Sequence, residues 1–173
     1  MTCDMDIQNI YNSIAEHSCE IVRECTARSV KISAAESCTG GMISGAVTSI
    51  SGSSAVIELG VCSYSNRIKH EILHVPAEVL KQFTEYSVEC AAEMAKGVME
   101  LSGADYGVST TGVAGPTGGS AEHPVGEVCI AVSGRNGCRS ERFLFAQGST
   151  DRELIRALAA EKALSMLLCE IKK

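Results

Sequence analysis

A short turn in this sequence gathers the side chains of a nucleophilic site. Residues 31–41 are Lys-Ile-Ser-Ala-Ala-Glu-Ser-Cys-Thr-Gly-Gly, so small apolar residues lead into Ser37 and Thr39 and then into Gly40 and Gly41. The apolar start suits a buried strand, and apolar residues at helical spacing over 42–50 predict a helix after the glycines. Unpaired N–H groups at a helix start favour developing negative charge. Ser37 is therefore a candidate nucleophile beside oxyanion donors, although on the turn alone a plain helix cap is the simpler interpretation.

A candidate base lies beyond the next β-prone segment. This segment ends in Tyr64-Ser-Asn66, and Lys69 follows on an expected short helix. A lysine near a serine acts as a general base when burial or neighbouring positive charge lowers its pKa toward neutrality. Tyr64 would then orient or relay the proton. Taken singly, Lys69 is a solvated helix residue and Tyr64 an exposed aromatic, but the four histidines form no paired motif, which favours Ser-Lys over Ser-His-Asp.

A glycine-rich loop and an arginine are candidates for binding an anion. Thr110 and Thr111 lead into the loop 112–119, whose glycines let backbone N–H groups approach a phosphate. The loop is neither a P-loop nor a G-x-G-x-x-G fingerprint, and a plain connection is the alternative. Arg152 opens the last helix, where it can pair with a phosphate or carboxylate or simply form a first-turn ion pair.

The remaining pattern predicts the elements that must position these groups. Asn66 is expected to cap the short helix and Ser87 a longer one that ends at Gly103. The expected strands cover the start of 31–41 and residues 55–64, 105–111, 126–133 and 139–146. The expected helices cover residues 5–26, 42–50, 66–72, a short segment that begins at Pro76, 87–103 and 150–171.

These elements predict an α/β fold, a three-layer α/β/α sandwich with a mixed, mostly parallel sheet. Strands separated by helices imply parallel crossovers, and the last two strands form an antiparallel hairpin. The polar motifs fall at 36–39, 64–69 and 110–119, each at the carboxyl end of an expected strand. Ligands of open α/β sheets bind there, so we expect the three motifs to share one site.

Length and composition narrow the function classes. The 173 residues suit one domain, 1–173, and the net charge of -6 argues against non-specific binding to nucleic acid or to a membrane surface. No apolar stretch is long enough to cross a bilayer, and the start of the chain lacks a signal peptide pattern. Nine cysteines without a C-x-x-C pair indicate core residues in a reduced cytoplasmic compartment, and no metal site is expected.

In order and spacing, the three motifs together resemble the CinA C-terminal domain family. They are Ala35-Glu-Ser-Cys-Thr-Gly-Gly41, Tyr64-Ser-Asn66 with Lys69, and Thr110-Thr-Gly-Val-Ala-Gly-Pro116 with Gly118-Gly119. The resemblance covers residues 5–171. It implies a compact, commonly dimeric α/β/α protein with nicotinamide mononucleotide deamidase activity. This reaction yields nicotinate mononucleotide and ammonia in pyridine-nucleotide recycling, without a metal or organic cofactor.

The resemblance also assigns roles to single residues. Ser37 is similar to the family's nucleophile, Lys69 to its general base and Tyr64 to an assisting group. Thr111 resembles a substrate or oxyanion contact and Arg152 a binding residue. The remaining residues expected to bind the nucleotide substrate are Thr39, Gly40, Gly41, Gly112, Gly115, Gly118 and Gly119.

Two other functions fit the same residues. The first is a nucleotide-binding regulatory module without catalysis, linked to competence or DNA damage, in which Lys69 stays charged and inert. The second is a different small amidase or esterase that uses the same Ser-Lys pair. Cys38 would be either a reactive thiol beside the nucleophile or only a small residue.

Overall fold

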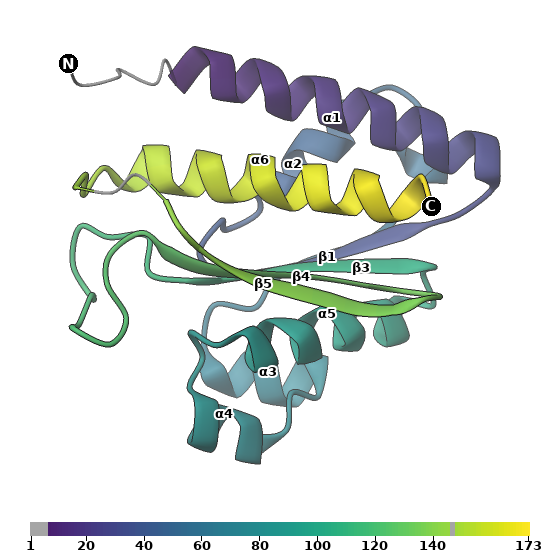
Figure 1. Ribbon diagram of the computed structural model, residues 1–173. Helices are drawn as coiled ribbons and strands as arrows, with labels where there is room; N and C mark the ends of the chain where they lie inside the picture. The colour runs from purple at the N-terminus through teal and green to yellow at the C-terminus, as the bar shows by residue number, and fades with distance from the viewer. Residues whose placement is uncertain (1–6, 146–147) are drawn as a thin grey trace.

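A mixed β-sheet lies between two layers of helices in the computed structural model, which describes residues 7–145 and 148–173 (Figure 1). The strands are β1 (Ile32–Glu36), β2 (Ile57–Cys62), β3 (Tyr106–Gly112), β4 (Glu127–Gly134) and β5 (Gly137–Leu144). The helices are α1 (Ile7–Arg28), α2 (Met42–Thr48), α3 (Asn66–Leu73), α4 (Ala77–Phe83), α5 (Val88–Ser102) and α6 (Arg152–Ile171), with a 3-10 turn at Ser53–Ala55. The expected helix 5–26 and strand 139–146 each extend slightly outside the described residues.

Within those residues the strand order is β2-β1-β3-β4-β5. Strand β1 pairs in parallel with β2 and β3, whereas β4 is antiparallel to both β3 and β5. Of the described strands, four therefore point the same way and only β4 is reversed. This confirms the predicted α/β class and the mixed sheet, and it brings the carboxyl ends of β1, β2 and β3 to one edge.

Helices α1, α2 and α6 cover one face of the sheet, and α3, α4 and α5 cover the other (Figure 1). Every residue of β1 is buried, as expected for a parallel strand covered on both faces. The larger apolar core lies on the α1–α6 side, where Ile21, Ile32 and Leu164 are fully buried. The smaller core under α3 and α5 contains Leu73 and Met94. The predicted three-layer architecture is therefore present.

The predicted helix boundaries at Ser87 and Gly103 are correct, and two others are wrong by one residue. The expected helices 5–26 and 42–50 end instead at Arg28 and Thr48. The Ser87 hydroxyl accepts the Cys90 N–H at 3.0 Å, and Gly103 ends α5 in the left-handed conformation with φ 70°. Asn66, however, is the first residue of α3, because the preceding Ser65 is extended and its hydroxyl accepts the Ile68 N–H at 3.3 Å. Pro76 likewise precedes α4, since its ψ of 136° is not helical.

The buried carboxylate of Glu36 ties the end of β1 to the start of α2. One oxygen accepts the N–H groups of Gly41 and Ile43, each at 3.0 Å, and the other accepts the Ser44 N–H at 2.9 Å. The hydroxyls of Thr39 and Ser44 also donate to this carboxylate, one to each oxygen and both at 2.7 Å. Glu36 therefore caps α2 from the strand, and a negative charge is favourable at this helix end.

The turn between β1 and α2 also depends on its two glycines. Gly40 has φ 61° and Gly41 has φ 95°, both in the left-handed region that glycine enters without strain. This backbone path returns the chain to Glu36 within a few residues. Ser37, which follows Glu36 directly, is therefore held on a short, fixed turn at the edge of the sheet.

Helix α3 is positioned by close contact with α5. A Cβ at Gly97 of α5 would lie 2.0 Å from the Leu73 carbonyl oxygen, so the backbones approach only because Gly97 has no side chain. Lys69 and Leu73 are one helical turn apart, and both are buried. The contact at Gly97 thus fixes the helix that carries the candidate base.

We expect Glu36→Gln to destabilise the fold by about 3 kcal/mol, because the amide leaves buried donors without acceptors and removes a hydrogen-bonded charge. The free energy of unfolding in urea measures this loss. Glu58→Gln is the matched control on β2, since Glu58 is exposed and pairs with Lys31 at the surface; its cost should stay below about 1 kcal/mol. Equal losses in the two variants would contradict the role of Glu36.

Two glycine-to-alanine substitutions should change stability in opposite directions. Gly97→Ala should destabilise by about 1–3 kcal/mol, because the methyl group overlaps the Leu73 carbonyl. Gly45→Ala in α2 has open space around its Cβ and should stabilise by about 0.5–1 kcal/mol. Thermal and urea unfolding compare the two variants with the wild type. A neutral Gly97→Ala would show that α3 does not depend on this contact.

Candidate active site

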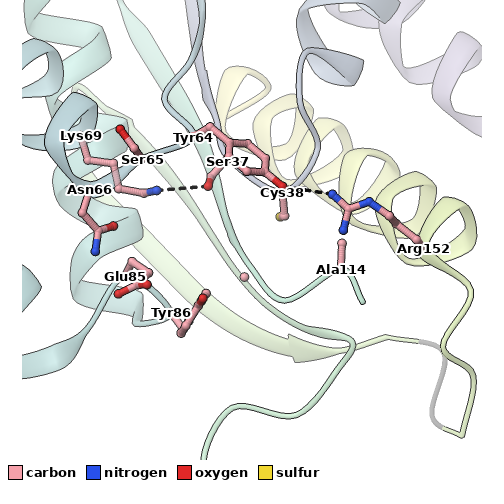
Figure 2. A pocket seen from close by; sticks show the side chains of 11 residues that line it. Ser37, Cys38, Tyr64, Ser65, Asn66, Lys69, Glu85, Tyr86, Ala114 and Arg152 are labelled. Atoms are coloured by element: carbon pink, nitrogen blue, oxygen red, sulfur yellow. Dashed lines mark hydrogen bonds between the residues drawn. The ribbon is translucent and has the colours of Figure 1, made fainter. Parts of the chain in front are cut away.

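The side chains of Ser37 and Lys69 meet at the carboxyl edge of the sheet (Figure 2). The ammonium nitrogen Nζ of Lys69 lies 3.1 Å from Ser37 Oγ and 3.1 Å from the Ser63 carbonyl oxygen. Ser37 follows β1, Ser63 follows β2, and Lys69 lies on α3. The N–H of Ser37 also donates to the Thr110 carbonyl at 3.0 Å, which continues the pairing of β1 with β3. Three strand ends thus hold the pair.

The surroundings of Lys69 disfavour its charge. The residue is only 1% exposed, and both of its hydrogen-bond acceptors are uncharged oxygens. Burial lowers the pKa of Lys69 below its ordinary value, and the nearby Cys90, Glu85 and Cys38 only partly oppose this effect. A lysine in this setting can lose its proton more readily than a solvated one, as a general base beside a serine requires.

A polar cavity of about 310 Å³ opens above this pair. Its size is near the lower end of the range of roughly 300–1,000 Å³ that ligand pockets occupy. Five residues predicted for the site line it, namely Ser37, Tyr64, Lys69, Gly112 and Arg152. The other lining residues are Cys38, Ser65, Asn66, Glu85, Tyr86 and Ala114.

Arg152 and Tyr64 form the other wall of the cavity (Figure 2). Arg152 donates to the Gly115 carbonyl at 2.7 Å and to the Tyr64 hydroxyl at 3.2 Å. Tyr64 is 65% exposed, so its ring lies at the cavity mouth rather than in the core. The guanidinium of Arg152 is exposed and already oriented, which suits the binding of a phosphate or carboxylate.

The backbone of the turn supplies candidate oxyanion donors, although fewer than the sequence suggests. The Gly41 N–H is occupied by Glu36. Within the described part of the chain, the N–H groups of Cys38, Thr39 and Gly40 make no hydrogen bond. Of these residues, Cys38 lines the cavity, so its N–H is the candidate donor to a negative oxygen beside Ser37.

Arg156 of α6 holds this turn from the opposite side. Its guanidinium donates to the carbonyl oxygens of Cys38 at 3.1 Å and Thr39 at 2.7 Å. The sequence analysis did not single out Arg156. Its spacing from Arg152 could have identified it from the sequence, because residues four apart on a helix share one face and Arg156 lies one turn after Arg152.

Cys38 is small and buried in this structure. Burial raises the pKa of its thiol to about 12. The thiol is therefore protonated at neutral pH, and a protonated thiol is a poor nucleophile. Of the two roles left open by the sequence, the structure favours that of a small residue beside Ser37.

The other predicted binding residues lie outside the cavity lining. The Thr39 hydroxyl is buried between Glu36 and Thr110, and the Thr111 hydroxyl donates to the Glu85 carbonyl at 2.6 Å. Gly40 and Gly41 shape the turn, and Gly115 contributes the carbonyl that accepts from Arg152. Gly118 and Gly119 are exposed on the loop beyond.

Sequence reasoning overlooked Glu85 and Tyr86, which lie in the turn between α4 and α5. This turn is not at a strand end, so the rule that placed the other motifs did not apply to it. Ser65 and Asn66 belong to a motif that was recognised, but they were assigned no binding role. Among the described residues, no cluster of three metal-ligating side chains occurs, and no helix is long and apolar enough to span a membrane.

Comparison with known proteins identifies close relatives of this chain. It is 45% identical over 160 residues to the nicotinamide-nucleotide amidohydrolase PncC of Enterobacter agglomerans, covering 91% of this chain and 95% of that protein. It is 46% identical over 140 residues to a CinA-like protein of Geotalea daltonii, covering 81% of this chain but 33% of the relative. The chain thus spans about a third of that relative's length.

Solved structures of other proteins have the same fold. The crystal structure of the competence/damage inducible protein CihA from Agrobacterium tumefaciens superposes with a TM-score of 0.88 at 40% identity, covering 93% of this chain and 96% of that one. The competence damage-inducible protein A of Klebsiella pneumoniae gives a TM-score of 0.86 at 33% identity, covering 92% and 97% of the two chains. The family model of the CinA C-terminal domain matches residues 14–171. The chain therefore belongs to the CinA C-terminal domain family.

Proposed function

We propose that this protein hydrolyses the carboxamide of nicotinamide mononucleotide, with Ser37 as nucleophile and Lys69 as general base. The observation that carries the proposal is the contact of 3.1 Å between Lys69 Nζ and Ser37 Oγ in a polar cavity. The 45% identity to an amidohydrolase of nicotinamide nucleotides supports the choice of substrate.

The first step forms a tetrahedral intermediate, which becomes an acyl-enzyme when ammonia leaves in the second step. Neutral Lys69 keeps one N–H on the Ser63 carbonyl and accepts the Ser37 hydroxyl proton with its lone pair. Ser37 Oγ bonds to the carboxamide carbon, and the carbonyl oxygen becomes an oxyanion. The free N–H group of Cys38, which lines the cavity, is the donor for this oxyanion.

The second step releases both products. Protonated Lys69 returns its proton to the leaving nitrogen, the C–N bond breaks, and ammonia departs. Water then attacks the acyl carbon while Lys69 accepts a proton from it. Protonated Lys69 returns this proton to Ser37 Oγ as the bond between Oγ and the acyl carbon breaks, which yields nicotinate mononucleotide and restores the serine hydroxyl and neutral Lys69.

In this proposal the substrate phosphate binds at Arg152. The guanidinium reaches the cavity and is held by Gly115 and Tyr64, whereas Gly118 and Gly119 lie outside the cavity lining. The phosphate cradle expected on loop 112–119 is thereby replaced by a side chain at the start of α6. Tyr64 orients Arg152 and borders the substrate.

A second candidate function is a nucleotide-binding module without catalysis. The solved relatives are described as competence- or damage-inducible proteins, which names no reaction. The same cavity would bind the nucleotide, and Lys69 would remain a charged structural residue. Turnover by the purified protein separates the two functions.

We expect ammonia release from nicotinamide mononucleotide by the wild type. It should fall by at least about 10³-fold in Ser37→Ala and by about 10²–10⁴-fold in Lys69→Met, because the nucleophile and its base are lost. A coupled ammonia assay measures the rates. Lys81→Met, which removes an exposed lysine of α4, is the matched control and should keep wild-type activity.

These outcomes distinguish the hypotheses, provided that thermal melts show each variant to be folded. Wild-type activity in Ser37→Ala would remove Ser37 from the mechanism. An inactive wild type that still binds the nucleotide would favour the binding module. Release of ammonia from other small amides, but not from the nucleotide, would indicate a different amidase.

The pH dependence of kcat/KM should report the protonation of Lys69. The base must be neutral, so the rate rises with pH up to the pKa of Lys69. Because burial lowers that pKa, the plateau should begin below the ordinary lysine value of about 10.4. Initial rates across the pH range measure the profile. A profile without a rising limb, in a protein stable throughout, would contradict Lys69 as the base.

A further inference from the structure

The turn between α4 and α5 has an unusual backbone at the edge of the cavity. Thr84 has φ 67° and ψ 171°, a region that is essentially reserved for glycine and costs a β-branched residue about 1–3 kcal/mol. The next two residues, Glu85 and Tyr86, line the cavity. Such strain persists only where the surrounding structure holds the backbone firmly.

Side chains from three elements hold this turn. The Thr111 hydroxyl of β3 donates to the Glu85 carbonyl at 2.6 Å, and the Cys129 thiol of β4 donates to the Tyr86 carbonyl at 3.3 Å. Ser87, the cap of α5, donates to the Thr84 carbonyl at 2.9 Å. Thr111 therefore acts on the cavity indirectly, because it fixes the backbone of Glu85, which lines the cavity.

The ring of Tyr86 is braced as well. It packs against His123 with 5.2 Å between the ring centroids. The Nδ1 atom of His123 lies 2.9 Å from a carboxylate oxygen of the buried Glu127. In Figure 2, Glu85 and Tyr86 lie together below Ser37, whereas Arg152 lies to its right beyond the ring of Tyr64. The cavity thus has a carboxylate and an aromatic ring at one end and a guanidinium at the other.

Glu85 carries a negative charge at neutral pH. Burial acts to raise its pKa, but hydrogen bonding by its own backbone and by Asn66, together with the charge of Lys69, holds that pKa below the ordinary value. A carboxylate that stays ionised cannot donate a proton to the substrate. It can instead attract a positive charge, and the face of an aromatic ring does the same.

We propose that Glu85 and Tyr86 form a subsite for a positively charged heteroaromatic ring, so that the cavity prefers a quaternary pyridinium carboxamide to a neutral one. The inference rests on the proposed function, because it names the feature of the substrate that this wall recognises. In nicotinamide mononucleotide the positive ring directly carries the carboxamide. A ring held near Ser37 therefore meets both the nucleophile and this wall.

The test compares two ligands that differ in ring charge. Nicotinamide mononucleotide and its 1,4-dihydro form share the carboxamide, ribose and phosphate, but only the oxidised form has a cationic ring. Titration calorimetry with Ser37→Ala protein, which prevents turnover, gives both dissociation constants. We expect the oxidised form to bind at least about tenfold more tightly.

Glu85→Gln in the Ser37→Ala background should bring this ratio close to one by weakening the oxidised form alone. Glu78→Gln is the matched control, because it removes an exposed carboxylate from α4 and should leave the ratio unchanged. Tyr86→Leu is the second variant and should lower the ratio in part. A ratio that Glu85→Gln does not change, in a protein with an unchanged melt, overturns the subsite, as does failure to bind either form.

The binding ratio and the ammonia assay can fail separately, so the two proposals are tested apart. A wild type that releases no ammonia, together with a ratio that depends on Glu85, removes the amidohydrolase and keeps the subsite. Ammonia release with a ratio that is indifferent to Glu85 keeps the amidohydrolase and removes the subsite. The second result would leave Glu85 only as a charge that balances Lys69.

Discussion

The buried carboxylate of Glu36 is the interaction on which the rest of the site depends. It accepts five hydrogen bonds, three from backbone N–H groups around the start of α2 and two from hydroxyls. A charge with no solvent exposure is tolerable only when its oxygens are this fully bonded. Because Glu36 is the last residue of β1, the same bonds fix the strand, the turn and the helix together. Ser37 is thereby held in one position rather than on a mobile loop.

The backbone N–H groups around the start of α2 fall into two sets with different partners. The N–H groups of Gly41, Ile43 and Ser44 serve the fold, since Glu36 accepts all three. The N–H group of Cys38 in the preceding turn is left for the candidate chemistry, and Arg156 fixes that turn through the carbonyl oxygens of Cys38 and Thr39. Buried Lys69 is costly to keep charged, and only uncharged oxygens accept its hydrogen bonds. The fold therefore lowers the pKa of this lysine, which makes its neutral, proton-accepting form more available but makes the buried residue less stabilising to the structure.

The cavity also has opposite charges at its two ends. Arg152 reaches it from the start of α6, and Glu85 reaches it from the strained turn before α5. These segments lie far apart in sequence and on different layers, so the sheet edge between them sets their spacing (Figure 1). A ligand with one anionic and one cationic group matches this polarity. Net charge alone, at -6, would not have indicated it.

The sequence by itself determined the elements and the nucleophile turn. Apolar periodicity predicted the helices and strands, because each must bury one face or both. The rule that ligands bind at carboxyl ends of strands brought Ser37, Tyr64 and Lys69 to one site. Only the tertiary structure decided which polar groups are already occupied. Glu36 takes the Gly41 N–H across a local turn, whereas Thr111 binds the Glu85 carbonyl and Arg156 binds the turn through contacts between residues distant in sequence. Hydrogen-bond partners across a fold leave no periodic signal, so Glu85 and Tyr86 became visible as part of the site only once the layers were packed.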